Sequence, residues 1–277
     1  MKHILFLGFG FLAQALARRL DPAQWHITGT SRTAEGAAAI AAQGHEGIVF
    51  DDLHLIPTSV NHIVSSVPPD TNGDPVLRRF GDLLRLRKTE WLAYLSTTGV
   101  YGDHGGAWTD EDTPLTPNTE RGQRRLAAET AWSHLNPHIF RLAGIYGAGR
   151  NQLLSILDCT AKRVIKPGQV FSRIHVEDIA GILLASMEHL HPGRAYNVAD
   201  DEPCPPQDVV AFAATLLGKP VPPDIPFAEA QLSPMARSFY ADSKRVSNAR
   251  VKTELGYRFT YPNYRVGLTA LRDSLTV

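Results

Sequence analysis

The stretch from Ile4 to Ala13, which reads ILFLGFGFLA, decides the fold class of this 277-residue chain. Its first four residues form a short apolar run, as expected of a strand that is buried on both faces. Two glycines interrupt the run, and the segment from Phe11 to Leu20 then places apolar residues at helical spacing until Asp21 and Pro22 end it. The order strand, glycine turn, helix predicts the first unit of an α/β fold.

The glycine turn fits the pattern G-x-G-x-x-G/A. Gly8 permits a tight turn, Gly10 lets the backbone approach a pyrophosphate, and Ala13 is small enough for the helix to pack on the strand. Phe11 and Leu12 open the helix, whose amino end would face the phosphates. Because the pattern lies between a first strand and a first helix, it predicts a dinucleotide site at Gly8, Gly10, Phe11 and Leu12. A glycine-rich turn without a ligand is the alternative.

Strand-like and helix-like segments alternate through the first half of the chain. We expect strands at residues 4–7, 25–30, 47–50, 62–67, 91–96 and 138–142, and helices at 11–20, 34–42, 75–89 and 121–135. Such an alternation predicts an α/β fold with a doubly wound, parallel, Rossmann-like sheet.

The composition changes after about residue 150, where proline clusters occur at 203–206 and 220–223. They predict a smaller C-terminal lobe beside the carboxyl ends of the strands, where open α/β sheets bind ligands. We therefore expect a dinucleotide-binding domain at residues 1–150 plus roughly 172–202, and a smaller substrate lobe at 151–171 and 203–277.

The end of the second strand bears on the choice of cofactor. An enzyme that prefers NAD usually has an acidic residue there, but this chain has Thr30, Ser31 and Arg32. A guanidinium and two hydroxyls suit a 2′-phosphate, so NADP is preferred over NAD and Ser31 and Arg32 are predicted ligands. Asp51, after the third strand, is a candidate for the adenine end of the cofactor, with a helix cap or turn as the alternative.

The overall charge is balanced, with 28 Lys and Arg against 28 Asp and Glu residues. Nucleic acids and anionic membranes select a strong basic excess, so neither is expected as a partner. The two cysteines, Cys159 and Cys204, have no CxxC spacing and suggest no disulfide scaffold, and the histidines are scattered along the chain, so we expect no metal and a reducing, cytoplasmic setting. No apolar run reaches the roughly 18 residues that a membrane span needs.

The sequence at the end of the fifth expected strand resembles that of a known protein family. Residues 95–103, LSTTGVYGD, resemble the S-T-S/T-x-V-Y-G-D stretch of extended short-chain dehydrogenases/reductases, the epimerase/dehydratase-like proteins. Further stretches match that family in the same order: DEDTPL at 110–115, RLAGIYGAGR at 141–150, RIHVEDIA at 173–180 and YNV at 196–198. The stretches at 67–70 and 243–246 look more like the atypical branch. The resemblance implies an NAD(P)-dependent enzyme.

In that family a Tyr-x-x-x-Lys pair transfers the proton and holds the nicotinamide ribose. The resemblance places Arg121 at the tyrosine position and Arg125 at the lysine position, and Thr97 where the family has a hydrogen-bond donor to the reacting carbonyl. Arginine is effectively always protonated, so Arg121 cannot be an ordinary acid or base. Arg125 could bind the ribose or a phosphate, and Arg121 an anionic substrate group. Two solvated arginines on a helix are the alternative.

Three other side chains are weighed as replacements for the tyrosine. Tyr101 and Tyr146 belong to family motifs even where the usual tyrosine is present, so neither stands out. His175 has a titration range suited to acid/base work, but a packed histidine beside the helix expected at 177–190 is the simpler interpretation. Asp178 is expected to cap that helix or to place a charge at its start.

Two functions stay open. One is an NAD(P)-dependent oxidoreductase or epimerase-like enzyme acting on an unknown small molecule, which the retained Thr97 and the intact motifs of the second lobe favour. The other is a non-catalytic NAD(P)-binding redox sensor, which Arg121 favours. We lean to the enzyme. A homodimer through helices 75–89 and 121–135 is also possible, since Val76, Phe80, Leu83 and Leu84 form an apolar stripe that core burial explains equally well.

Overall fold

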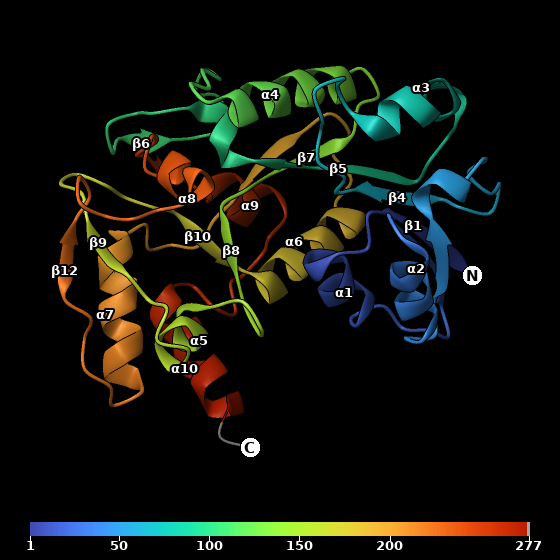
Figure 1. Ribbon diagram of the computed structural model, residues 1–277. Coiled ribbons are helices and arrows are strands. Elements are labelled where there is room, and N and C mark those ends of the chain that lie inside the picture. The colour runs from blue at the N-terminus through green and yellow to red at the C-terminus, as the bar shows by residue number, and fades with distance from the viewer. Residues whose placement is uncertain (276–277) are drawn as a thin grey trace.

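The structure, a computed structural model, describes residues 1–275 and is built on a parallel sheet of seven strands (Figure 1). The strand order is β11-β7-β5-β4-β1-β2-β3, the doubly wound Rossmann arrangement, so the predicted fold class is confirmed. The strands are β1 (Lys2–Leu7), β2 (Trp25–Ser31), β3 (Glu46–Val49), β4 (His62–Ser65), β5 (Trp91–Thr97), β7 (His138–Leu142) and β11 (Ala195–Val198).

Both faces of the sheet are covered by helices because its strands are apolar on both sides. In β1, Ile4 and Phe6 pack in one hydrophobic cluster, whereas Leu5 and Leu7 pack in another. Successive side chains of a strand point to opposite faces, so an unbroken apolar run needs a helical layer on each. Figure 1 shows one layer below the sheet, α1 (Phe11–Ala17), α2 (Ala34–Ala41) and α6 (Val176–Glu188), and one above it, α3 (Pro75–Leu86) and α4 (Glu120–Ser133).

The predicted elements of the first half are present, and their ends differ by a few residues. The helix expected at 75–89 ends at Leu86 because Arg87 is extended and turns back, donating from its guanidinium to the carbonyl oxygens of Ile56, Pro57 and Val60. The spacing of apolar residues along the helix cannot predict this contact, because it joins two segments that lie far apart in the sequence.

The apolar stripe on α3 is mostly core. Val76, Phe80 and Leu84 are buried in the second hydrophobic cluster, whereas Leu83 is 41% exposed. Burial within one copy therefore accounts for three of the four stripe residues, and the homodimer stays a prediction.

The rest of the chain surrounds the carboxyl edge of the sheet. Short strand pairs are formed by β8 (Gly144–Tyr146) with β10 (Arg173–His175), β9 (Arg163–Ile165) with β12 (Asp224–Pro226), and β6 (Trp108–Thr109) with β13 (Arg245–Val246). The remaining helices are α5 (Gln152–Leu157), α7 (Pro206–Leu216), α8 (Pro234–Phe239), α9 (Ala249–Glu254) and α10 (Tyr264–Leu275).

A third hydrophobic cluster joins α5, α7 and α10 away from the sheet. Val246, Val251 and Leu255 instead pack in the main cluster with β1 and α6, although they fall within the expected substrate lobe. The domain boundaries stay a prediction. No helix within residues 1–275 is both long and apolar enough to cross a membrane.

Candidate functional site

The glycine turn has the geometry that the sequence predicts. Gly8 has φ +95°, and a Cβ atom on it would lie 2.7 Å from Ser66 Oγ, so only glycine fits without strain. The Gly8 N–H donates to Thr30 Oγ1 at 2.9 Å, which ties the turn to the end of β2. At Gly10, by contrast, no protein atom lies within 4 Å of the position that a Cβ would occupy. This open backbone fits the close approach of a pyrophosphate.

The end of β2 offers fewer ligands than the sequence suggested. Thr30 is only 1% exposed, and its hydroxyl accepts from Gly8 and donates to the Phe6 carbonyl at 3.3 Å. It is therefore not available to a 2′-phosphate. Ser31 is half-buried, and Arg32 is exposed and has no polar contact with other residues among 1–275.

Asp51 lies in a short 3₁₀ helix at Phe50–Asp52, after β3. Its side chain is 84% exposed, and Nη1 of Arg79 lies 3.8 Å from its Oδ1. Both sequence interpretations fit this placement, since the residue is part of a turn and its carboxylate faces solvent.

Thr97 ends β5 and caps the following 3₁₀ helix η2 (Thr98–Tyr101). Its Oγ1 accepts a hydrogen bond from the Gly99 N–H at 3.2 Å. Because the oxygen acts as acceptor in this contact, the hydroxyl hydrogen stays available for a ligand.

Arg125 is fixed on the sheet side of α4. Its Nη1 donates to Tyr94 Oη at 3.0 Å and to the Leu95 carbonyl at 3.2 Å. The Tyr94 ring is buried and stacks on Trp132, and burial raises the pKa of its phenol to about 12. A phenol with such a pKa stays protonated, so Tyr94 anchors Arg125 as a neutral group.

Arg121 lies in the first turn of α4, where the helix packs on η2. Gly122 makes this packing possible, because a Cβ there would lie 3.0 Å from the Gly99 carbonyl oxygen. The Arg121 guanidinium lies over the ring of Phe239 on α8, 5.4 Å from its centroid. Desolvation, followed by the charges of Arg125 and Arg150, lowers the pKa of Arg121.

Arg150 has no role in the expectations from the sequence, and it lies in a turn near the start of α1. It closes a turn with Gly147 through two backbone hydrogen bonds of 2.9 and 3.0 Å. A Cβ on Gly147 would lie 3.2 Å from the Phe11 ring, so this turn packs against the start of α1. The only signal in the sequence was the arginine at the end of the IYGAGR motif.

Neither tyrosine considered as a replacement is free to act at this edge. Tyr101 is fully buried, and its hydroxyl donates to Asn197 Oδ1 at 2.8 Å and accepts from Arg141 Nη1 at 2.8 Å. Burial raises its pKa to about 12. Tyr146 is 8% exposed, its hydroxyl faces the Asn263 carbonyl at 3.4 Å, and burial raises its pKa further.

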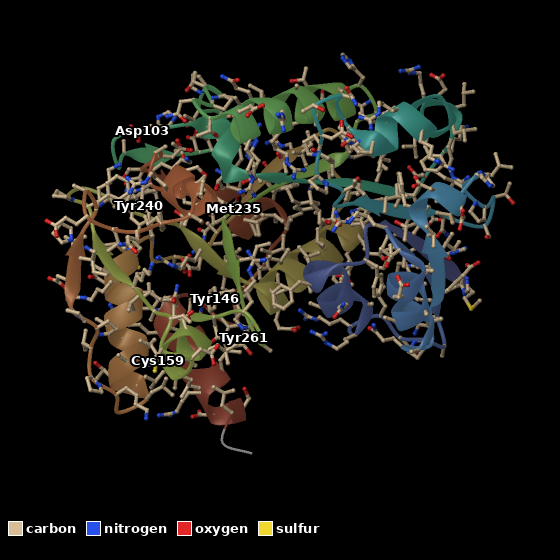
Figure 2. All side chains as sticks on the ribbon, in the orientation of Figure 1. Asp103, Tyr146, Cys159, Met235, Tyr240 and Tyr261 are labelled. Carbon is tan, nitrogen blue, oxygen red and sulfur yellow. The ribbon has the colours of Figure 1, made fainter. Side chains whose placement is uncertain are left out.

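His175 is a packed residue. Its ring packs against the rings of Tyr146 and Tyr261, at centroid distances of 5.1 and 3.9 Å. These two tyrosines are labelled in Figure 2. Its Nδ1 accepts from the Glu177 N–H at 3.2 Å, so His175 caps α6. Burial lowers its pKa to about 4, which keeps the ring neutral.

Asp178 does not cap α6, although it lies in the first turn. Its carboxylate accepts from Tyr257 Oη at 2.8 Å and from the backbone N–H groups of Thr260 and Tyr261 at 2.8 and 2.9 Å. The residue therefore anchors the segment that leads into α10.

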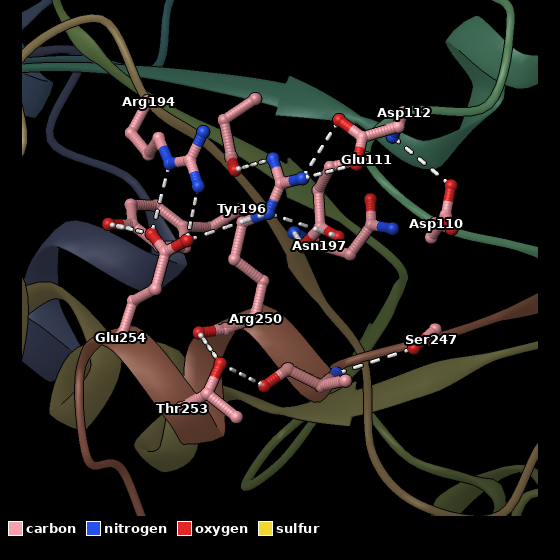
Figure 3. A network of polar contacts seen from close by, with 12 residues as sticks. Asp110, Glu111, Asp112, Arg194, Tyr196, Asn197, Ser247, Arg250, Thr253 and Glu254 are labelled. Carbon is pink, nitrogen blue, oxygen red and sulfur yellow. Dashed lines mark hydrogen bonds and ion pairs between the residues drawn. The ribbon is translucent and has the colours of Figure 1, made fainter.

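Several motif residues form a polar scaffold behind the site. Glu111 Oε1 accepts from the Asn197 N–H at 2.7 Å, and Arg250 binds both carboxylate oxygens of Asp112 at 2.9 Å (Figure 3). Arg141 pairs with Glu129 at 2.7 Å in the interior. These side chains hold β7, β11 and α9 together and do not reach the open edge.

The opposite edge of the sheet carries a cluster that the sequence did not suggest. Ligand atoms of His3, His26 and Glu46 all lie within 4.8 Å of one another. His3 Nε2 and Glu46 Oε2 both contact Thr28 Oγ1, at 2.8 and 2.6 Å. The cluster is already linked by hydrogen bonds, and it lies at the amino ends of the strands, away from the glycine turn.

Comparisons with known proteins agree with the fold. No family model matches the chain. A curated relative, the 3-diazoavenalumate denitrifying reductase of a Streptomyces species, is 30% identical over 178 residues, and the match spans only 57% of the length of each protein. A functionally unknown conserved protein from Silicibacter pomeroyi DSS is 51% identical, with a TM-score of 0.95 and full coverage of both chains.

Two further solved structures are similar to the chain. A putative NAD-dependent epimerase/dehydratase from Methylobacillus flagellatus is 27% identical, with a TM-score of 0.77 over 100% of this chain and 99% of that one. The human epimerase family protein SDR39U1 (isoform 2), solved with NADPH, shares the fold at 19% identity, with a TM-score of 0.76 and 99% coverage of both. The chain is thus similar in fold to NAD-dependent epimerase/dehydratase-like proteins, and Arg121 and Arg125 stand where the sequence resemblance places that family's Tyr-x-x-x-Lys pair.

Proposed function

We propose that the chain is an NADPH-dependent reductase of a small molecule. The observation that carries this proposal is the contact of Gly122 with Gly99, which puts Arg121 beside the loop that Thr97 begins. This loop follows β5, on the same edge of the sheet as the glycine turn. The name of the curated relative, a reductase, supports the reductive direction.

The cofactor would be held by residues from four segments. Gly8, Gly10, Phe11 and Leu12 would surround the pyrophosphate, and Ser31 and Arg32 the 2′-phosphate, which favours NADPH over NADH. Asp51 would lie toward the adenine. Arg125 would hold the nicotinamide ribose with guanidinium N–H groups other than those used by Tyr94 and Leu95. When bound, the nicotinamide supplies a hydride.

Thr97 and Arg121 would stabilise the negative charge that develops on a reduced substrate atom. The Thr97 hydroxyl donates a hydrogen bond to that atom, and the Arg121 guanidinium lies near it as a fixed positive charge. A single donor of this kind typically contributes about 10²–10³-fold to kcat. Arg121 keeps its own protons, so water supplies the proton that completes the product.

The same residues offer no protein acid or base for the proton of the reaction. A guanidinium neither gives up nor accepts a proton near neutral pH, so water would carry the proton in the reduction and in its reverse. Tyr101 and Tyr146 are buried and hydrogen-bonded, and His175 is buried with its Nδ1 hydrogen-bonded, so none replaces the family's tyrosine. The direction of hydride transfer would then follow the cofactor that is supplied, and NADPH supplies the reductive one.

Binding and turnover test this proposal separately. NADPH and NADH are titrated into the full chain, and NADPH consumption is then followed with a panel of aldehydes, ketones and 3-diazoavenalumate. We expect Thr97→Val to lower kcat/KM by about 10²-fold and Thr97→Ser to keep most of the activity. An unchanged Thr97→Val variant would remove Thr97 from the reaction, and failure to bind either cofactor would refute the function.

The second candidate function is a non-catalytic NADPH sensor, and Arg121 at the tyrosine position is the observation that favours it. In that case NADPH binds but no panel member is turned over. An Arg121→Tyr variant that gained activity would support a sensor derived from an enzyme.

A further inference from the structure

Polar side chains from β1, β2 and β3 come together on one face of the sheet, near the amino ends of these strands. The strand register pairs His3 with His26 and Thr28 with Glu46. His26 and Thr28 are two positions apart on β2, so their side chains point to the same face. One ring nitrogen each of His3 and His26 and one carboxylate oxygen of Glu46 all lie within 4.8 Å of one another. The register of three strands, and not a local sequence motif, builds this cluster.

His3 is the buried and oriented member of the cluster. It is 5% exposed, its Nδ1 lies 2.9 Å from Ser59 Oγ, and its Nε2 lies 2.8 Å from Thr28 Oγ1. Histidines that bind metal ions usually use their other ring nitrogen in a hydrogen bond, which fixes the ring and the position of its proton. When the proton is on Nδ1, Ser59 Oγ accepts it, and the lone pair of Nε2 faces the cluster.

His26 and Glu46 form the accessible side of the cluster. Their side chains are 43% and 46% exposed, and His26 Nε2 lies 3.2 Å from Glu46 Oε2. Two atoms bound to one zinc ion lie about 3.3 Å apart, because the bonds are about 2.0–2.1 Å long and meet at a tetrahedral angle. This pair already has that spacing, and a shift of at most about 1.5 Å brings in the His3 nitrogen.

The buried Thr28 holds the cluster in this arrangement. Its hydroxyl donates to Glu46 Oε2 at 2.6 Å, and its oxygen lies beside His3 Nε2. The carboxylate is thereby kept on the His3 side of the sheet although it is exposed to solvent. A ligand set that is held in place before binding loses less conformational freedom when the ion binds.

The donor atoms decide which ions fit. Two imidazole nitrogens and one carboxylate oxygen suit zinc and other divalent transition metals, whereas magnesium and calcium prefer oxygen ligands. Three protein ligands leave the fourth position of a tetrahedral ion to water. The exposure of His26 and Glu46 gives the ion and this water access from solvent.

We infer that His3, His26 and Glu46 bind a divalent transition-metal ion, such as zinc, that joins β1, β2 and β3. β3 has four residues and lies at the edge of the sheet, so a bond from Glu46 to the ion would tie this edge to the two strands beside it. The site shares no residue with the proposed cofactor site, so the inference is independent of the proposed function. A hydrogen-bonded cluster without an ion is the competing interpretation.

The test uses the full chain without an affinity tag, treated with EDTA and dialysed. ZnCl₂ and MgCl₂ are titrated by calorimetry into the native chain, His26→Asn and Glu46→Gln, which replace exposed side chains. The control is His134→Asn, which removes an exposed histidine at the end of α4. We expect the native chain and the control to bind one Zn²⁺ and no Mg²⁺. His26→Asn and Glu46→Gln should each weaken Zn²⁺ binding by more than about ten-fold, the loss that even an outer-shell partner of a metal causes.

Thermal unfolding gives a second readout, because an ion that binds only the folded chain raises its Tm. Zn²⁺ should raise the Tm of the native chain and of His134→Asn, and it should raise that of His26→Asn and Glu46→Gln much less. Absence of saturable Zn²⁺ binding to the native chain in the micromolar range would overturn the inference and leave a hydrogen-bonded cluster only. Native Zn²⁺ affinity in both His26→Asn and Glu46→Gln, or an equal loss in His134→Asn, would overturn it as well, because the ion would then bind elsewhere.

Discussion

Gly122 and Gly99 touch so closely that a Cβ atom on Gly122 would lie 3.0 Å from the Gly99 carbonyl oxygen. This contact joins the first turn of α4 to the loop after β5, and with it Arg121 to the neighbourhood of Thr97. Two glycines thus set the spacing between the two side chains proposed to stabilise charge.

Replacing Gly122 should disturb this spacing. In Gly122→Ala the new methyl group would also lie 2.8 Å from the Pro117 Cβ, so the helix must shift away from η2. We expect a loss of about 1–3 kcal/mol in the free energy of unfolding, as for other overpacked sites. Urea denaturation measures it.

Gly81→Ala is the matched control, because Gly81 lies inside α3 and the nearest atom to its Cβ position is 3.9 Å away. It should gain up to about 1 kcal/mol from the higher helix propensity of alanine. Equal effects of the two substitutions would show that the Gly122 contact is not tight.

Arg32 tests the cofactor preference. Because Arg32 has no polar contact with another residue within 1–275, its removal should leave stability unchanged. Arg32→Ala should weaken NADPH by about ten-fold and NADH much less, since only NADPH carries the 2′-phosphate. Fluorescence titration with both cofactors measures the ratio, and equal losses would refute the NADP assignment.

Asp200 should make stability fall as the pH rises. It is 1% exposed, its Oδ2 has no hydrogen-bond partner among the described residues, and burial raises its pKa to about 8. Because the folded pKa lies above the unfolded one, about 3.9, the folded chain binds an extra proton. The stabilisation is complete below pH 4 and is lost by about pH 8.

In Asp200→Asn this loss should be absent. We expect the variant to gain stability relative to the native chain between pH 5 and pH 8, by up to about 1.4 kcal/mol per pH unit. Urea denaturation at both pH values measures the difference, with the exposed Asp82→Asn as control. Parallel pH profiles of the native chain and Asp200→Asn would show that Asp200 does not titrate in this range.

The buried pair of Arg141 and Glu129 should contribute strongly to the free energy of unfolding. Both side chains are at most 7% exposed, and Arg141 also donates to Tyr101 and the Glu111 carbonyl. Arg141→Met leaves a buried carboxylate without its partner, which should cost about 3–5 kcal/mol of unfolding free energy. Arg194→Met, which breaks the exposed pair with Glu254, should change stability little. Similar losses in both variants would contradict a special role for burial.

Local signals predicted much of the fold. The run from Ile4 to Leu7 is apolar at every position, and the structure buries alternate residues of it in two different clusters. Gly8 was predicted to turn the chain and does so with a positive φ. Each of these features depends on a few neighbouring residues, whose conformational preferences act before any distant contact forms.

The site was predicted less completely. The sequence predicts that the Thr30 hydroxyl is available to a ligand. In the structure it accepts a hydrogen bond from the N–H of Gly8, which lies 22 positions earlier in the chain. The sequence assigns no role to Arg150, because the packing of its turn against the start of α1 depends on contacts between segments far apart in the chain. No sequence motif indicates that the Phe239 ring packs against the Arg121 guanidinium.

The sequence by itself determined the strand–turn–helix order and the glycine turn, and its resemblance to a known family drew attention to Arg121 and Arg125. Only the tertiary structure decided that Arg121 and Arg150 have no acidic partner within residues 1–275, while Tyr101, Tyr146 and His175 are buried. The physical reason is that burial and charge pairing depend on contacts between residues far apart in the chain, and these are fixed only when the sheet register and the helix packing are complete.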